Sequence, residues 1–147
     1  MLLAAVVMGA VLACVDVRCR RLPDPVVGLL AVSAGVPLTV GAVVAGEPGR
    51  AGRALLAAVL VGVAYLGVAL LPGGGLGLGD VKLAAVLAFV LGFIGWPAVA
   101  VGTVLPHLVN GPVAVVLLLT GRAGRRTALP FGPALLVGAL LGVATTA

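Results

Sequence analysis

The chain has 147 residues, of which 63% are hydrophobic and 9% are charged, and its mean hydropathy is +1.36. This composition excludes an ordinary water-soluble domain, in which about a quarter of the residues are charged, and it indicates a protein that lies in a lipid bilayer. The formal net charge is +5, but the nine basic residues lie in short segments between apolar runs, where they act as topology determinants, so nucleic-acid binding is not expected.

Six apolar segments are candidates for membrane-spanning helices, for which about 20 apolar residues suffice. In chain order they are Met1–Val15, about Pro25–Ala45, Ala54–Leu71, the two halves of Leu83–Gly121, and about Pro130–Ala147. The two halves separate at Gly95-Trp96-Pro97, because glycine and proline interrupt helices. The sequence therefore predicts an all-α, polytopic membrane protein with about six transmembrane helices, which pack closely through its 23 glycines and other small residues.

The first segment has a second interpretation, because Val11-Leu12-Ala13-Cys14 resembles the cleavage site of a lipoprotein signal peptide. A signal peptide carries basic residues before its apolar core. Here Arg18, Arg20 and Arg21 follow the core and none precedes it. We therefore expect Met1–Val15 to be a retained helix with its amino end outside the cell.

The distribution of basic residues predicts the orientation of the whole chain, because alternate loops lie on the same side of the membrane. One side receives seven basic residues, which are Arg18, Arg20, Arg21, Lys82, Arg122, Arg125 and Arg126. The other side receives Arg50 and Arg53. The first side is therefore predicted to face the cytoplasm, and it also carries Asp16, Asp24 and Asp80.

Two of the four acidic residues, Asp16 and Asp80, lie at the ends of apolar segments. A charge near hydrocarbon is costly unless a function or a partner retains it. The two acids are 80 − 16 = 64 residues apart, and the two intervening helices can fold back to bring them together. Two structural roles remain open: Asp80 as a helix N-cap, and Asp16 as an interfacial partner of Arg18 or Arg20.

Five glycines precede the second acid in Gly73-Gly74-Gly75-Leu76-Gly77-Leu78-Gly79-Asp80. A stretch of this composition does not form a stable helix. Irregular backbone at membrane depth is tolerated where it packs against protein or lines a wet cavity. The sequence therefore predicts a glycine loop that delivers Asp80 into a polar cavity. A flexible cytoplasmic turn would explain the glycines, but not the order Gly-x-Gly-Asp-x-Lys.

Three blocks of the sequence resemble the type IV prepilin peptidases, in the order that this family has. Gly77-Leu78-Gly79-Asp80-Val81-Lys82-Leu83 is similar to the family's Gly-x-Gly-Asp signature, whose core the presenilin-like intramembrane proteases share. Asp16-Val17-Arg18-Cys19-Arg20-Arg21-Leu22-Pro23-Asp24 resembles a block of Asp, basic residues and Ile or Leu-Pro-Asn, with Asp24 in place of the usual Asn. Leu129-Pro130-Phe131-Gly132-Pro133 is similar to the Pro-Phe-Gly-Pro segment that opens the last span.

The resemblance implies an intramembrane aspartic endopeptidase with Asp16 and Asp80 as its catalytic pair. The supporting or substrate-binding residues that it implies are Gly77, Gly79, Lys82, Arg21, Pro130 and Gly132. The substrate would be a prepilin or pseudopilin, cut at the cytoplasmic boundary of the inner membrane. Bifunctional members carry an amino-terminal part with paired C-x-x-C motifs, which this chain lacks. Residues 1–147 therefore resemble the short, peptidase-only form, a single membrane-embedded domain, and neither methyltransferase activity nor S-adenosylmethionine binding is expected.

No metal or other cofactor is expected, because Cys14 and Cys19 have the spacing of neither a redox motif nor a zinc site. His107, close to Asn110 in an apolar span, is interpreted as a hydrogen-bonding residue between helices rather than a catalyst. Two other functions stay open, a small ion-coupled transporter or channel and a noncatalytic subunit of a pilus or secretion apparatus. The sequence specifies neither the oligomeric state nor which acid acts first as the base.

Overall fold

The computed structural model describes residues 24–71, 76–120 and 131–146. This part of the chain forms five helices: α2 (Asp24–Val44), α3 (Pro48–Ala69), α4 (Leu78–Ile94), α5 (Trp96–Leu119) and α6 (Phe131–Thr146). The predicted all-α class is confirmed, and these helices occupy the second to the sixth predicted segments. The first segment, Met1–Val15, lies outside the described residues, so the count of six helices and the outward amino terminus stay predictions.

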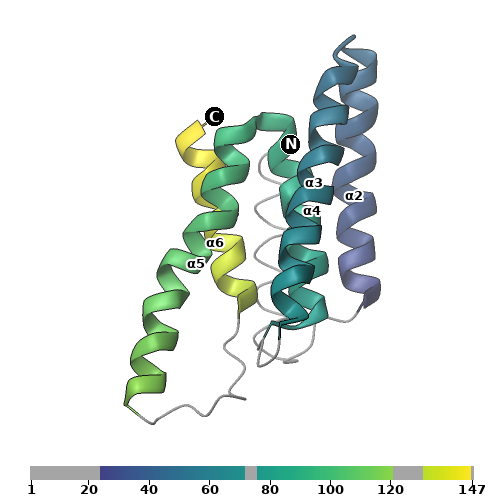
Figure 1. Ribbon diagram of the computed structural model, residues 1–147. Helices are drawn as coiled ribbons and strands as arrows, with labels where there is room; N and C mark the ends of the chain where they lie inside the picture. The colour runs from purple at the N-terminus through teal and green to yellow at the C-terminus, as the bar shows by residue number, and fades with distance from the viewer. Residues whose placement is uncertain (1–23, 72–75, 121–130, 147) are drawn as a thin grey trace.

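Consecutive helices run in opposite directions, so the bundle has two distinct ends (Figure 1). The first residues of α2, α4 and α6 lie at one end, together with the last residues of α3 and α5. We call this the Asp80 end, because Asp80 lies in the first turn of α4. Lys82 lies near the same end, whereas Arg50 and Arg53 lie near the start of α3, at the opposite end. These charges are therefore divided between the two ends as the sequence predicts.

Two helix boundaries differ from the prediction. The third predicted segment starts at Ala54, but α3 already begins at Pro48, because a proline in the first turn lacks only an N–H group that would have no helical partner. The break after α4 is confined to Gly95, whose N–H donates to the Leu91 carbonyl at 3.0 Å. Trp96 and Pro97 already belong to α5.

The helices pack through small residues, as predicted. A Cβ atom added to Gly92 of α4 would lie 2.5 Å from the Cα atom of Ala54 in α3. A Cβ atom added to Gly142 of α6 would lie 2.7 Å from the carbonyl oxygen of Ala98 in α5. These contacts join α3 to α4 and α5 to α6, and the four helices meet mainly through α4, whereas α3 and α5 touch only slightly.

The outside of the bundle is apolar. Many large aliphatic side chains are exposed, including those of Leu29 in α2 and Leu55 in α3. The segments Val27–Val44 and Pro48–Ala69 are long and apolar enough to cross a membrane. Because an aqueous surface would not expose this much aliphatic area, the described helices indicate a membrane protein.

Candidate functional site

Asp80 lies in the first turn of α4, with its side chain half-buried. The residue that caps this helix is Gly77, whose carbonyl accepts hydrogen bonds from the N–H groups of Asp80 at 3.0 Å and Val81 at 3.3 Å. The helix-cap interpretation of Asp80 is therefore wrong in position, since Asp80 lies three residues after the cap. A carboxylate there still benefits from the positive end of the helix dipole.

The glycines beside Asp80 have different roles. Leu76 and Gly77 are not helical, as predicted, but Leu78 and Gly79 belong to α4, so the predicted loop ends earlier than expected. The dipole and the packed turns that follow stabilise this first turn despite its glycine. A Cβ atom added to Gly77 would lie 3.6 Å from Oδ2 of Asp80, which is van der Waals contact. The absence of a side chain at Gly77 therefore leaves space beside the carboxylate.

The other predicted site residues are only partly described. Lys82 is exposed and lies two residues after Asp80 on α4, a spacing that directs the two side chains to different sides of the helix. Gly132 lies in the first turn of α6 and Asp24 begins α2, so both lie at the Asp80 end. Asp16, Arg21 and Pro130 lie outside the described residues. The pairing of Asp16 with Asp80 therefore stays a prediction.

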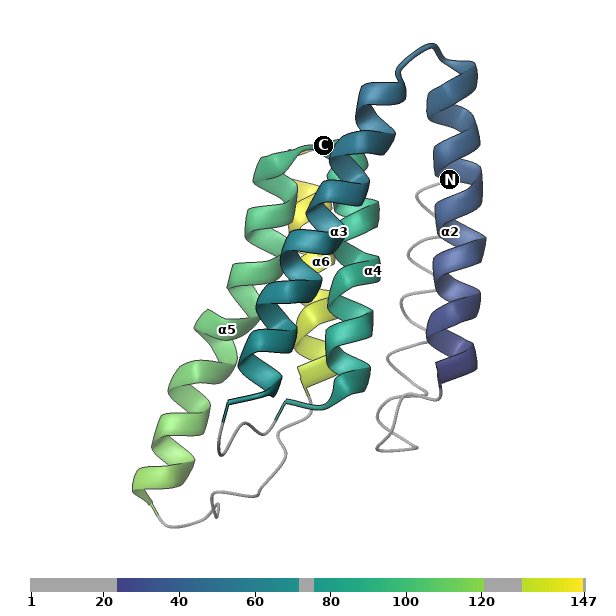
Figure 2. The ribbon, with the colours of Figure 1, turned by 45° about the vertical axis from the view of Figure 1, so that its right-hand side comes forward.

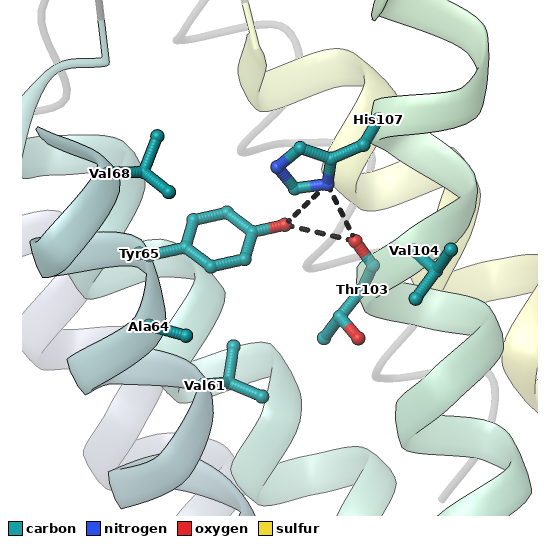
Figure 3. A pocket seen from close by; sticks show the side chains of 7 residues that line it. All are labelled: Val61, Ala64, Tyr65, Val68, Thr103, Val104 and His107. Atoms are coloured by element: carbon teal, nitrogen blue, oxygen red, sulfur yellow. Dashed lines mark hydrogen bonds between the residues drawn. The ribbon is translucent and has the colours of Figure 1, made fainter. Parts of the chain in front are cut away.

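A polar cluster joins the end of α3 that lies toward Asp80 to the middle of α5 (Figure 3). The Tyr65 hydroxyl lies 3.1 Å from the Thr103 carbonyl oxygen and 3.3 Å from Nδ1 of His107. Nδ1 of His107 lies 2.9 Å from the same carbonyl oxygen, and the two rings meet edge to face with their centroids 5.1 Å apart. The prediction that His107 forms hydrogen bonds between helices is confirmed.

The cluster implies a definite arrangement of protons. A carbonyl oxygen only accepts hydrogen bonds, so the 2.9 Å contact assigns a proton to Nδ1 of His107. The Tyr65 hydroxyl donates to the same oxygen, and its own oxygen, 3.3 Å from Nδ1, accepts a share of the Nδ1–H bond across the two helices.

Tyr65 also connects this cluster with Asp80. Its buried side chain packs in one apolar cluster with Val81 and Ala84, which lie one and four residues after Asp80 on α4. The sequence analysis missed Tyr65. Its signal was that the chain's one tyrosine lies inside an apolar span.

A cavity of about 290 Å³ lies beside the polar cluster, between α3 and α5. Its lining residues are Val61, Ala64, Tyr65 and Val68 from α3 and Thr103, Val104 and His107 from α5 (Figure 3). The walls are mainly apolar, and the polar atoms gather on one side (Figure 3). Among the described residues, no group of three or more His, Cys, Asp or Glu side chains has the arrangement of a metal site.

Comparison with known proteins gives a consistent result. The sequence pattern of the type IV leader peptidase family matches residues 3–120. The prepilin leader peptidase/N-methyltransferase of Bacillus subtilis (strain 168) is 39% identical over 97 residues, which make up 66% of this chain and 35% of that protein. The matched region therefore spans about a third of the relative's length. No solved structure matches the chain.

Proposed function

The chain belongs to the type IV leader peptidase family, and we propose that it is an intramembrane aspartic endopeptidase that removes the leader peptides of type IV prepilins or pseudopilins. The observation that carries this proposal is the position of Asp80. It lies in the Gly-x-Gly-Asp sequence at the start of α4, beside the space left by Gly77 and at the same end as Gly132.

The proposed mechanism uses Asp16 and Asp80 as a pair. Two carboxyl groups held close together do not both ionise readily, so one keeps its proton and the pair titrates as a unit. The ionised carboxylate takes a proton from water, which attacks the scissile carbonyl carbon. The protonated carboxyl donates its proton to the carbonyl oxygen, and the roles exchange when the tetrahedral intermediate breaks and the amine leaves.

The proposed location is the inner membrane, with the Asp80 end facing the cytoplasm. The distribution of basic residues along the chain supports this orientation. A prepilin whose short basic leader stays in the cytoplasm and whose apolar helix lies in the bilayer would present its cleavage site at that face. The proposed partners are therefore this substrate and the lipid bilayer.

Only peptidase activity is proposed. The name of the Bacillus subtilis relative also includes N-methyltransferase, but the aligned region is 35% of that protein. The family pattern matches residues 3–120, which contain both Asp16 and Asp80 and therefore support the peptidase function.

The test is cleavage of a co-expressed prepilin in membranes that contain the wild type, Asp16→Ala or Asp80→Ala at equal abundance. We expect each variant to lose at least about 10²–10⁴-fold in cleavage rate, because general acid–base catalysis contributes that much. Glu47→Gln is the matched control, since it removes an acid at the opposite end of the bundle and should keep the wild-type rate. Cleavage that persists in either Asp variant would contradict the aspartic mechanism and favour the transporter or the assembly subunit.

A further inference from the structure

The two helices that line the cavity diverge toward the Asp80 end. In Figures 1 and 2 the last turns of α5 extend away from α3 and α4 and beyond their ends. Among the side chains that the structure describes in this part of α5, those of Leu108, Val113, Val115, Val116 and Leu119 are exposed and aliphatic. We call the cavity, with its seven lining residues, the α3–α5 groove.

Two prolines lie in this half of α5. Pro106 and Pro112 lack a backbone N–H, so each interrupts the ladder of helical hydrogen bonds and lets the helix bend there. Pro106 itself is buried and lies beside His107. The hydrogen bonds of His107 therefore hold α5 near α3 at the point where the helix can bend.

The groove has polar atoms that its aliphatic walls do not require. Tyr65, Thr103 and His107 place a hydroxyl, a carbonyl and an imidazole on one side of the cavity. Asn110 lies on the same face of α5 as Thr103 and His107, because these residues are spaced by four and three positions. Its Nδ2 atom is buried and has no hydrogen-bond partner among the residues that the structure describes.

These features match a particular ligand chemistry. A peptide bond inside a transmembrane helix must leave the helix before it can be hydrolysed, and its N–H and C=O groups then lack partners in a medium without water. A groove that receives such a segment needs aliphatic walls for its side chains and polar atoms for its backbone. A lipid acyl chain would need only the walls and would make no use of the hydroxyl, carbonyl and imidazole on the polar side of the cavity.

We propose that the α3–α5 groove binds the apolar helix of the peptide substrate and that Tyr65 and His107 pair with the backbone that unwinds before cleavage, with Asn110 next along the same face of α5. This assignment depends on the peptidase function proposed above. Tyr65 packs against the first turns of α4, so the unwound segment would lie on the side of the bundle from which Asp80 is reached. The cavity, at about 290 Å³, is at the lower limit of small-molecule pockets and suits a few aliphatic side chains.

Photocrosslinking tests the occupant directly. Benzoylphenylalanine replaces Val68 or Val104 in the groove, or Val137 on α6 as a control outside it, with all three side chains exposed in the wild type. Each substitution is made in the Asp80→Ala variant with a co-expressed prepilin, so that bound substrate stays uncut. We expect adducts with the prepilin from Val68 and Val104, at least tenfold above those from Val137. Adducts with lipid alone, or equal adducts from all three positions, would overturn the proposal.

Filling the groove separates this inference from the proposed function. Ala64→Trp occupies the cavity, whereas Ala100→Trp adds the same volume at an exposed position of α5 outside it. We expect Ala64→Trp to raise KM for the prepilin at least tenfold with kcat within threefold, and Ala100→Trp to leave both within twofold. If the wild type cuts and the two variants have equal KM, the groove assignment is wrong and the peptidase function stands. If the wild type does not cut the prepilin, the peptidase function fails first.

Discussion

The two ends of the bundle are built in different ways. At the end opposite Asp80, the Arg53 side chain donates from Nε to the Gly92 carbonyl at 2.7 Å and from Nη2 to the Phe93 carbonyl at 3.2 Å. These carbonyls belong to the last turn of α4, where a helix leaves acceptors without internal partners. Ala54 of α3 packs against the same turn of α4. At this end, α3 and α4 are therefore held together by close backbone packing and by hydrogen bonds from a charged side chain.

Toward the Asp80 end, polar groups are partly or fully buried among apolar side chains. Asp80 is half-buried, α5 diverges from α3, and Asn110 keeps a buried amide without a partner among the described residues. Such features lower stability and persist where a function requires them. The comparison agrees with the proposals above, in which the end with Arg53 maintains the fold and the Asp80 end binds and cuts the substrate.

The strongest structural test of this comparison is Gly92→Ala. The added Cβ would lie 2.5 Å from the Cα of Ala54, and backbone atoms cannot move aside as a flexible side chain can. We expect the free energy of unfolding to fall by about 3 kcal/mol, the upper part of the usual range for overpacking. Thermal unfolding in detergent measures the effect. Gly52→Ala on α3 is the control, because no heavy atom lies within 4 Å of its added Cβ, and an equal loss in both variants would contradict the close-packing explanation.

Arg53→Met tests the hydrogen bonds between Arg53 and the last turn of α4. Methionine keeps the apolar stem but leaves the Gly92 and Phe93 carbonyls without the charged donor. We expect a loss of about 2 kcal/mol in unfolding free energy, because hydrogen bonds from charged groups contribute about 1.5–3 kcal/mol. The readout is again thermal unfolding in detergent.

The control for Arg53→Met is Arg50→Met. Arg50 forms an exposed ion pair with Glu47 at 2.7 Å, and exposed pairs contribute about 0–1 kcal/mol. If Arg50→Met destabilised the protein as much as Arg53→Met, the carbonyl contacts would not be the cause. Cleavage per folded molecule should stay near the wild-type rate in both variants, because neither residue lies at the Asp80 end.

The sequence predicted the helices well because hydropathy and the cost of charge in lipid determine them. The predicted break near Gly95 and the packing through glycine follow from these local rules. The extension of α4 over Leu78 and Gly79 was missed, because propensity alone disfavours glycine and cannot register the packing of the following turns. The partner of His107 was also missed. Tyr65 is 42 residues away, and a sequence pattern does not predict which residues of two distant helices come into contact. The catalytic role of Asp80 was predicted from its motif and stays a prediction, and the groove was not predicted.

The smallest expected effect on stability comes from Tyr65→Phe, at the Asp80 side of the comparison. The change removes a hydroxyl that donates to the Thr103 carbonyl and keeps the ring that packs with Val81. We expect a loss of about 1 kcal/mol in unfolding free energy, the usual net value of one hydrogen bond. Prepilin cleavage should fall about tenfold, which corresponds to about 1.4 kcal/mol at the transition state, because the same hydroxyl is proposed to contact the substrate backbone.

Thr145→Val removes a hydroxyl that bonds only within α6, at 2.7 Å from the Leu141 carbonyl, and should change neither quantity appreciably. If Tyr65→Phe lowered stability and left cleavage per folded molecule unchanged, Tyr65 would serve the fold alone, and both ends of the bundle would then be structural except for the acids.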